Sequence, residues 1–211
     1  MFNIDIYNEI SQKIENFGKK TNIIAVSKNH PKQAVEKALL HGVKIFGENR
    51  VQEAQTKFKD LKKNHTDLEL HLTGSLQTNK VKDAIKLFDI FHTLDREKLA
   101  REFVKVGGLK DKKFFIQVNT GKEKSKSGVY LEHLREFVEY CKIGLSLNVI
   151  GLMCIPPIDD EPKKHFTILA NEARKNNLFH LSIGMSADYV EAINFDASYI
   201  RIGTALFGER N

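Results

Sequence analysis

Short apolar runs alternate with amphipathic segments along the whole chain. The run NIIAVSK (residues 22–28) is followed by PKQAVEKALLHG (31–42), in which Pro and Gly stand at positions typical of a helix start and a helix end. Because this order recurs, the pattern predicts eight strands with a helix between successive strands, and one further helix near the N-terminus. We expect the strands at residues 22–28, 43–48, 68–74, 90–95, 112–120, 148–156, 180–185 and 198–208.

Apolar runs of this kind, without strict alternation of apolar and polar residues, are typical of parallel strands that helices cover. Eight strand–helix units predict a closed (β/α)8 TIM barrel of the α/β class, and an open doubly wound sheet is the alternative. The 211 residues suffice for one domain with a substantial core, and no linker or change of composition divides them. We therefore expect a single barrel domain over residues 1–211 with short loops.

Composition narrows the class of protein. The net charge is +6, but the lysines are spread over helix faces among acidic residues, which is typical of a solvated surface. A nucleic-acid-binding domain is a hypothesis that rests on this charge alone. No apolar run approaches the ~20 residues of a membrane span and no signal-peptide pattern is present, so we expect a cytoplasmic protein without membrane or nucleic-acid partners. The two cysteines, Cys141 and Cys154, lack metal-ligand spacing, so we expect two small buried residues, no disulfide and no metal site.

Candidate site residues are the polar groups at the carboxyl ends of the predicted strands, where a barrel of this type has its site. The segments SIGMSADY (182–189) and RIGTALFG (201–208) each place a glycine and a hydroxyl residue there. Glycine lets the backbone approach a ligand, and the hydroxyls of Ser186 and Thr204 add donors, so these turns favour a phosphate site over two ordinary turns. Other polar residues expected at this end are Glu48, Asn49, Ser75, Gln77, Asp95 and Asn119.

Two cations stand at unusual places in this pattern. Lys28 ends the first apolar run; it either extends to water or serves as a nucleophile whose amine is activated by desolvation and neighbouring cations. Arg201 lies inside an apolar strand, on the same face as Gly203, and needs either a salt bridge across the barrel or a ligand. A lysine, an arginine and a phosphate-binding turn around one barrel end suit a phosphorylated aldehyde.

Seven segments taken together resemble the pyridoxal phosphate homeostasis protein family. They are AVSKNHP, FGENRVQEAQTK, LHLTGSLQTNKVK, QVNTGKEKSKSGV, GLMCIPP, LSIGMSADYVEAI and YIRIGTALFGER, which extend from about Ile23 to Arg210. Three departures from the family pattern, Arg50, Leu70 and Thr73, touch the edge of the site and bear on ligand preference.

The resemblance implies a fold-type III barrel like the N-terminal domain of alanine racemase. It also implies that pyridoxal 5′-phosphate is held as an internal aldimine on Lys28. By motif position, Arg201 would face the pyridine nitrogen and Asn49 would lie close to the cofactor ring. The remaining residues that the resemblance assigns to the cofactor, at its phosphate, are Ser186, Gly203 and Thr204.

The resemblance also implies a role in vitamin B6 and amino-acid homeostasis, as a carrier of the cofactor. An arginine at the ring nitrogen leaves that nitrogen an unprotonated acceptor, and the ring is then a weaker electron sink. Alanine racemase takes its second base, a tyrosine, from a separate domain of a partner subunit; we expect no such domain here, and none of the five tyrosines is an obvious replacement. We therefore expect a monomeric carrier that delivers the cofactor to recipient apo-enzymes rather than an enzyme, with a pyridoxal phosphate-dependent amino-acid racemase as the alternative. The loop GKEKSKSG (121–128) is expected at the site rim, where its lysines either attract the anionic cofactor and gate its release or are solvated.

Overall fold

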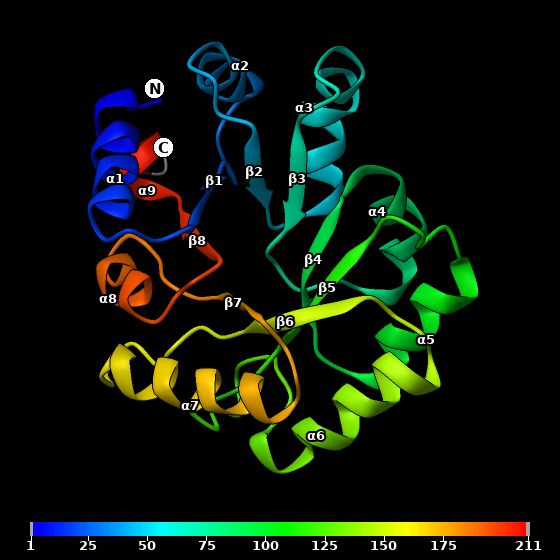
Figure 1. Ribbon diagram of the computed structural model, residues 1–211. Helices are drawn as coiled ribbons and strands as arrows, with labels where there is room; N and C mark the ends of the chain where they lie inside the picture. Colours follow the sequence, from blue (N-terminus) through cyan, green and yellow to red (C-terminus); the bar gives the residue numbers. More distant parts are fainter. Residues whose placement is uncertain (1, 210–211) are drawn as a thin grey trace.

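Eight parallel strands form a closed barrel in the computed structural model, which describes residues 2–209 (Figure 1). The strands follow one another around the barrel in chain order, and β1 pairs with both β2 and β8, which closes the sheet. Their bounds are β1 (Asn22–Val26), β2 (Ile45–Glu48), β3 (Glu69–Leu72), β4 (Ile90–Leu94), β5 (Lys113–Gln117), β6 (Val149–Met153), β7 (His180–Ser182) and β8 (Tyr199–Ile202). The predicted (β/α)8 barrel is confirmed and the open sheet is excluded. Residue 1 and residues 210–211 of the predicted domain lie outside the described residues.

Helices surround the barrel on its outer side (Figure 1). Their bounds are α1 (Ile4–Asn16), α2 (Lys32–Leu40), α3 (Val51–Asn64), α4 (Val81–Leu87), α5 (Glu97–Val106), α6 (Leu131–Glu139), α7 (Pro162–Lys175), α8 (Tyr189–Asn194) and α9 (Thr204–Phe207), with a short 3-10 helix η1 (Thr78–Lys80) and a π-helix η2 (Tyr140–Gly144). The predicted additional N-terminal helix is α1, which begins where the Asn3 side chain accepts a hydrogen bond from the Ile6 backbone N–H. Within the described chain, no helix is both long and apolar enough to cross a bilayer.

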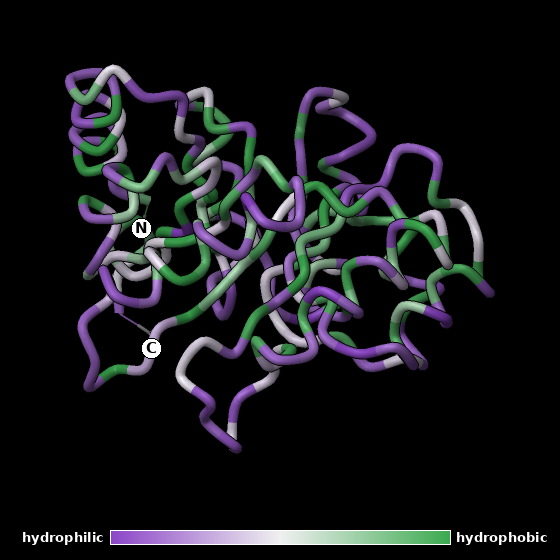
Figure 2. Tube along the Cα trace, turned by 60° about the horizontal axis from the view of Figure 1, so that its bottom comes forward, coloured by the Kyte–Doolittle hydropathy of each residue, from purple (hydrophilic) through white to green (hydrophobic). Residues whose placement is uncertain are grey.

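The main hydrophobic core lies between the strands and the ring of helices. The apolar runs are buried almost throughout; in β1, for example, all residues after Asn22 are inaccessible to solvent or nearly so. Phe46 of β2 packs on Phe58 of α3 with ring centroids 5.6 Å apart, which shows how a strand residue and a helix residue share this layer. Figure 2 shows the strands as mainly hydrophobic and the outer loops as mainly hydrophilic. Both cysteines are buried and unpaired by disulfides, as expected.

The predicted last strand, residues 198–208, is wrong in its second half. β8 ends at Ile202, and the helix α9 begins at Thr204 because the backbone of Gly203 leaves the extended conformation. The apolar run nevertheless continues, since Phe207 is buried against Phe2 with ring centroids 5.4 Å apart. An apolar run without polar interruption does not show whether it continues as strand or as helix.

Candidate functional site

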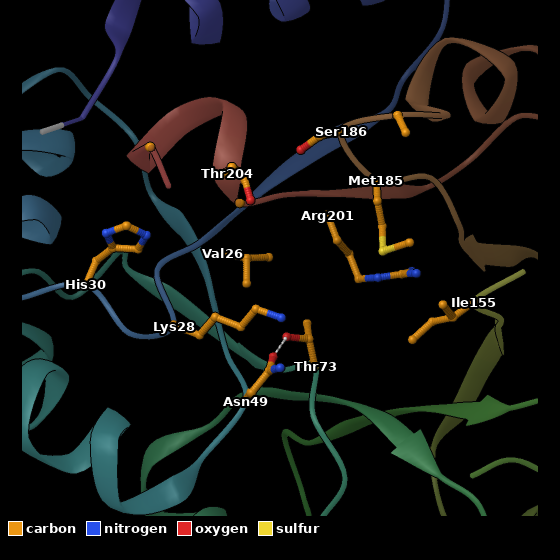
Figure 3. A pocket seen from close by; sticks show the side chains of 13 residues that line it. Val26, Lys28, His30, Asn49, Thr73, Ile155, Met185, Ser186, Arg201 and Thr204 are labelled. Atoms are coloured by element: carbon orange, nitrogen blue, oxygen red, sulfur yellow. Dashed lines mark hydrogen bonds between the residues drawn. The ribbon is translucent and has the colours of Figure 1, made fainter. Parts of the chain in front are cut away.

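A cavity of about 320 Å³ opens at the carboxyl ends of the strands, within the size range of small-molecule sites (Figure 3). The six residues that the sequence assigns to a cofactor all line it, although the first and the last of them, Lys28 and Thr204, are 176 positions apart in the sequence. The lining residues are Val26, Lys28, His30, Asn49, Thr73, Ile155, Met185, Ser186, Ala187, Arg201, Gly203, Thr204 and Gly208. The barrel thus brings together one primary amine, one guanidinium and several hydrogen-bond donors.

Lys28 follows β1, and its side chain extends into the cavity (Figure 3). The residues on either side of it are fixed by a buried ion-pair cluster under the turn. Lys57 of α3 donates hydrogen bonds to the Ser27 carbonyl oxygen (2.6 Å), to Glu48 Oε1 (2.8 Å) and to Glu53 Oε1 (2.6 Å). The Glu53 carboxylate also accepts from the backbone N–H that follows Lys28. The backbone on both sides of Lys28 is therefore held by hydrogen bonds to the helix α3.

Glu48 belongs to this cluster rather than to the cavity lining, although the sequence placed it among the polar residues at strand ends. Its side chain is inaccessible to solvent, accepts from Ser27 Oγ (2.6 Å) and forms an ion pair with Lys57. Burial raises the pKa of the Glu48 carboxyl, and the neighbouring Lys57 opposes this shift. Its role is to help hold the Lys28 turn.

Arg201 of β8 reaches the cavity from the opposite side (Figure 3) and is 6% exposed. Its Nη1 donates to the carbonyl oxygen of Ser182 (2.7 Å) and to its Oγ (2.8 Å), and its Nη2 donates to the carbonyl oxygen of Cys154 (3.0 Å). Desolvation lowers the pKa of the guanidinium. Among residues 2–209 no carboxylate lies within ion-pair distance, so the salt bridge that was one of two expectations for Arg201 is not formed there. A buried cation with no carboxylate partner among these residues favours an electron-rich or anionic ligand.

The turns after β7 and β8 form a third part of the cavity wall, to which Ser186 and Thr204 each contribute a side chain (Figure 3). The first turn requires glycine at position 184, where φ is +88° and an added Cβ would lie 2.5 Å from the Ala192 Cβ. At Gly203 an added Cβ would meet the protein only at ordinary contact distance, 3.4 Å from the Val26 carbonyl oxygen. The protein itself therefore leaves room for a side chain at position 203, and the space belongs to the cavity.

Asn49 follows β2 and is oriented by a residue that the sequence analysis treated only as a departure from a family pattern. Thr73 Oγ1 donates to Asn49 Oδ1 (2.9 Å, dashed in Figure 3), which leaves the Asn49 amide nitrogen as a donor at the cavity. The next residue, Gly74, packs so closely that a Cβ there would lie 2.5 Å from the Asn49 carbonyl oxygen. The Thr73 hydrogen bond therefore determines which group of Asn49 faces a ligand, and Gly74 allows the close approach of the two loops.

Four other predicted candidates do not line this cavity, namely Ser75, Gln77, Asp95 and Asn119. Asp95 forms an ion pair with Arg96 and lines a separate cavity beside α5 and α6. Asn119 holds the 121–128 loop, because its side chain donates to the Glu123 carbonyl oxygen (2.8 Å) and accepts from the Glu123 backbone N–H (3.1 Å). Position at the end of a strand therefore does not by itself show whether a polar residue lines the cavity.

The 121–128 loop borders the site, since Ile155 lines both the main cavity and a smaller one formed by Ser125, Lys126 and Ser127. Lys126 lies 2.8 Å from Glu123 and Lys122 lies 3.5 Å from Glu132. Two of the loop's three lysines are thus partly neutralised by acids of the same region.

Sequence reasoning missed His30 and Ala187, and it placed Thr73, Ile155 and Met185 at this end of the barrel only within segments or at the edge of the site. All five lie in loops after strands, where no periodicity shows which side chains turn toward the cavity. A usable signal existed for Lys57, a cation within the apolar stripe formed by Ala54, Phe58 and Leu61 of α3.

Fold and site together define a small-molecule-binding (β/α)8 barrel of the alanine racemase N-terminal type, and the family described as "Alanine racemase, N-terminal domain" matches residues 6–211. A relative from Aquifex aeolicus (strain VF5), named "Pyridoxal phosphate homeostasis protein", is 37% identical over 219 aligned positions, which cover 97% of this chain and 95% of the relative. The chain therefore belongs to the pyridoxal phosphate homeostasis protein family, as its sequence motifs indicated.

Solved structures agree with this assignment. The structure of PipY from Synechococcus elongatus PCC7942 without PLP is 35% identical, with a TM-score of 0.82 and coverage of 90% of this chain and 93% of PipY. The structure of the same protein with PLP bound is 32% identical, with a TM-score of 0.80 and coverage of 94% and 100%. The barrel of this chain thus superimposes on a relative whose structure contains that cofactor.

Proposed function

We propose that this protein binds pyridoxal 5′-phosphate as a Schiff base on Lys28 and acts in vitamin B6 and amino-acid homeostasis by carrying the cofactor. The observation that carries the proposal is a single cavity that unites Lys28, the buried Arg201 and the hydroxyl-bearing turns at Ser186 and Thr204. The names of the relatives and the PLP-bound PipY structure support the choice of ligand.

The residues present fit this ligand group by group. The aldehyde requires a primary amine, which Lys28 supplies inside the cavity. The phosphate requires donors and room for close approach, which Ser186, Thr204 and the space over Gly203 supply. Asn49 presents its amide nitrogen to the ring region. When bound, the cofactor supplies an electrophilic carbon and a ring that can delocalise electrons.

Arg201 limits how far that delocalisation goes. Three hydrogen bonds already engage its two terminal nitrogens, and a guanidinium has five N–H groups, so donors remain for a ring nitrogen. A guanidinium does not give up its proton, which leaves the ring nitrogen an acceptor and weakens the electron sink. The site therefore suits reversible binding better than carbanion chemistry.

The tyrosines support a carrier over the alternative racemase. Racemisation of an amino acid on a weak electron sink needs strong bases on both faces of its α-carbon. No tyrosine of the described chain lines the cavity. Tyr199 is turned into the barrel interior, where burial raises its pKa to about 12. We accordingly propose a cytoplasmic monomer that delivers its cofactor to recipient apo-enzymes, and its mass in solution is measurable by analytical ultracentrifugation.

Visible absorbance tests the proposal. Protein incubated with the cofactor and desalted should be yellow, and the band should vanish in Lys28→Ala. Lys20→Ala is the matched control, because Lys20 is an exposed lysine that precedes the same strand at the other end of the barrel. Reduction with borohydride should attach the cofactor to the peptide that contains Lys28. A colourless wild-type protein, or a band that survives Lys28→Ala, would refute the proposal, and substantial turnover of amino-acid enantiomers would favour the racemase.

A further inference from the structure

A continuous chain of side-chain hydrogen bonds runs through the barrel interior below Arg201. Arg201 Nη1 lies 2.8 Å from Ser182 Oγ, which lies 2.8 Å from His92 Nδ1. His92 Nε2 lies 2.8 Å from His71 Nδ1, and His71 Nε2 lies 2.7 Å from Glu69 Oε1. The serine and both histidines are inaccessible to solvent, whereas the Glu69 side chain is 33% exposed at the first residue of β3. The chain therefore connects the cavity with the opposite end of the barrel.

The two ends of the chain determine the direction of every bond in it. A guanidinium can only donate, so Ser182 Oγ accepts from Arg201 and has its own proton to give to His92 Nδ1. A carboxylate can only accept, so His71 carries its proton on Nε2, and its Nδ1 accepts from His92 Nε2–H. The argument from the arginine end and the argument from the glutamate end assign the same tautomer to both rings, with the proton on Nε2. Burial lowers the pKa of both histidines, in keeping with neutral rings.

Aromatic neighbours hold the two imidazoles in place. The His92 ring stacks on Phe115 with centroids 4.6 Å apart, and the His71 ring meets the edge of Tyr199 at 5.0 Å. Both rings are thus prevented from turning without repacking of the interior.

The hydrogen-bond chain also connects the buried charge of Arg201 with a carboxylate. The guanidinium has no carboxylate within ion-pair distance among the described residues, but the chain below it ends on one. Because all bond dipoles point the same way, each bond polarises the next, and Ser182 Oγ becomes a better acceptor for the guanidinium. The hydrogen bond from His71 holds the pKa of Glu69 below its usual value, so the terminal group is a carboxylate.

We propose that Glu69, His71, His92 and Ser182 are positioning residues that hold the Arg201 guanidinium through a one-directional hydrogen-bond chain. None of the four lines the cavity. Through Arg201 they set how strongly the site binds a ligand with an electron-rich ring nitrogen, a consequence that rests on the proposed function. A substitution of Glu69, at the far end of the barrel, is therefore expected to change the affinity for the ligand.

The first test uses the protein without cofactor, so that its outcome is independent of the proposed function. Long-range 1H–15N NMR of histidine- and arginine-labelled protein should show neutral His71 and His92, both protonated on Nε2. Glu69→Gln removes the charge at a partly exposed position and should shift the resonances of both rings and of the Arg201 guanidinium. Asp67→Asn is the matched control, since Asp67 is a carboxylate at the same end of the barrel. It pairs with Lys44 at 2.6 Å and takes no part in the hydrogen-bond chain.

The second test measures the affinity for pyridoxal phosphate by absorbance titration. Glu69→Gln should weaken binding several-fold and Ser182→Ala by about tenfold or more, the expectation for a hydrogen bond to a charged group. Asp67→Asn should bind as wild type does. Protonation on Nδ1 in either ring would overturn the proposed hydrogen-bond chain. So would Arg201 resonances that respond equally to Glu69→Gln and Asp67→Asn. Wild-type protein with the expected resonances but no affinity for the cofactor would instead refute only the proposed function.

Discussion

The ion-pair cluster under Lys28 makes the sharpest prediction about stability. Lys57→Met keeps the unbranched apolar part of the side chain but removes Nζ and with it all three hydrogen bonds. The Glu48 carboxylate then lies in the interior with no cation, and Glu48 Oε2 already has no hydrogen-bond partner among the described residues. Removing one member of a buried ion pair costs about 3–5 kcal/mol. We expect the free energy of unfolding at pH 7 to fall by that amount in urea denaturation followed by circular dichroism.

The pH dependence identifies the cause of the loss. In Lys57→Met the pKa of Glu48 in the folded state rises further above its unfolded value, so folding retains a proton that the unfolded chain has released. Such a group stabilises the folded state at low pH and loses this contribution as pH rises. As pH rises through the range in which unfolded glutamates release their protons and above it, the variant should lose stability relative to wild type, by at most roughly 1.4 kcal/mol per pH unit.

Two further variants decide whether the reasoning holds. Adding Glu48→Gln to Lys57→Met removes the buried charge and should recover most of the lost stability and abolish the pH slope. Lys63→Met is the matched control, since Lys63 lies on the same helix and pairs with Asp60 in an exposed ion pair, which contributes little to stability. A loss below about 1 kcal/mol in Lys57→Met, or a double variant no better than the single one, would refute the account of this cluster.

Three further outcomes are expected elsewhere in the molecule. Gly184→Ala combines a positive φ with a Cβ 2.5 Å from the Ala192 Cβ, so thermal denaturation should show a loss of about 2 kcal/mol or more; a wild-type midpoint would contradict this. Thr73→Val keeps the shape but loses the hydrogen bond to Asn49, so cofactor affinity should fall several-fold with little change in the denaturation midpoint; equal loss of both would argue against a role at the site. Both cysteine thiols should resist a thiol reagent at pH 8 and react only in denaturant, because burial raises each pKa to about 12; fast reaction of the native protein would count against this.

Periodicity was sufficient for the architecture. Eight apolar runs separated by helical patterns predict the closed barrel, and the rule that such barrels carry their site at the carboxyl ends of strands places Lys28 and Arg201 at the same end of it. The boundary of β8 was not predictable in the same way. The apolar residues beyond Ile202 are equally compatible with a strand and with α9, and only the backbone of the folded chain, which leaves the extended conformation at Gly203, shows which they form.

The fold class and the residue types available at the strand ends can be read from the sequence, because both follow from local periodicity and from a general property of barrels. Which of those residues meet depends on the folded structure. Lys57 under the Lys28 turn, Thr73 against Asn49, and Ser182 beneath Arg201 are contacts between elements distant in sequence. Such contacts depend on strand register and on the way each loop folds back, and neither leaves a periodic trace in the chain.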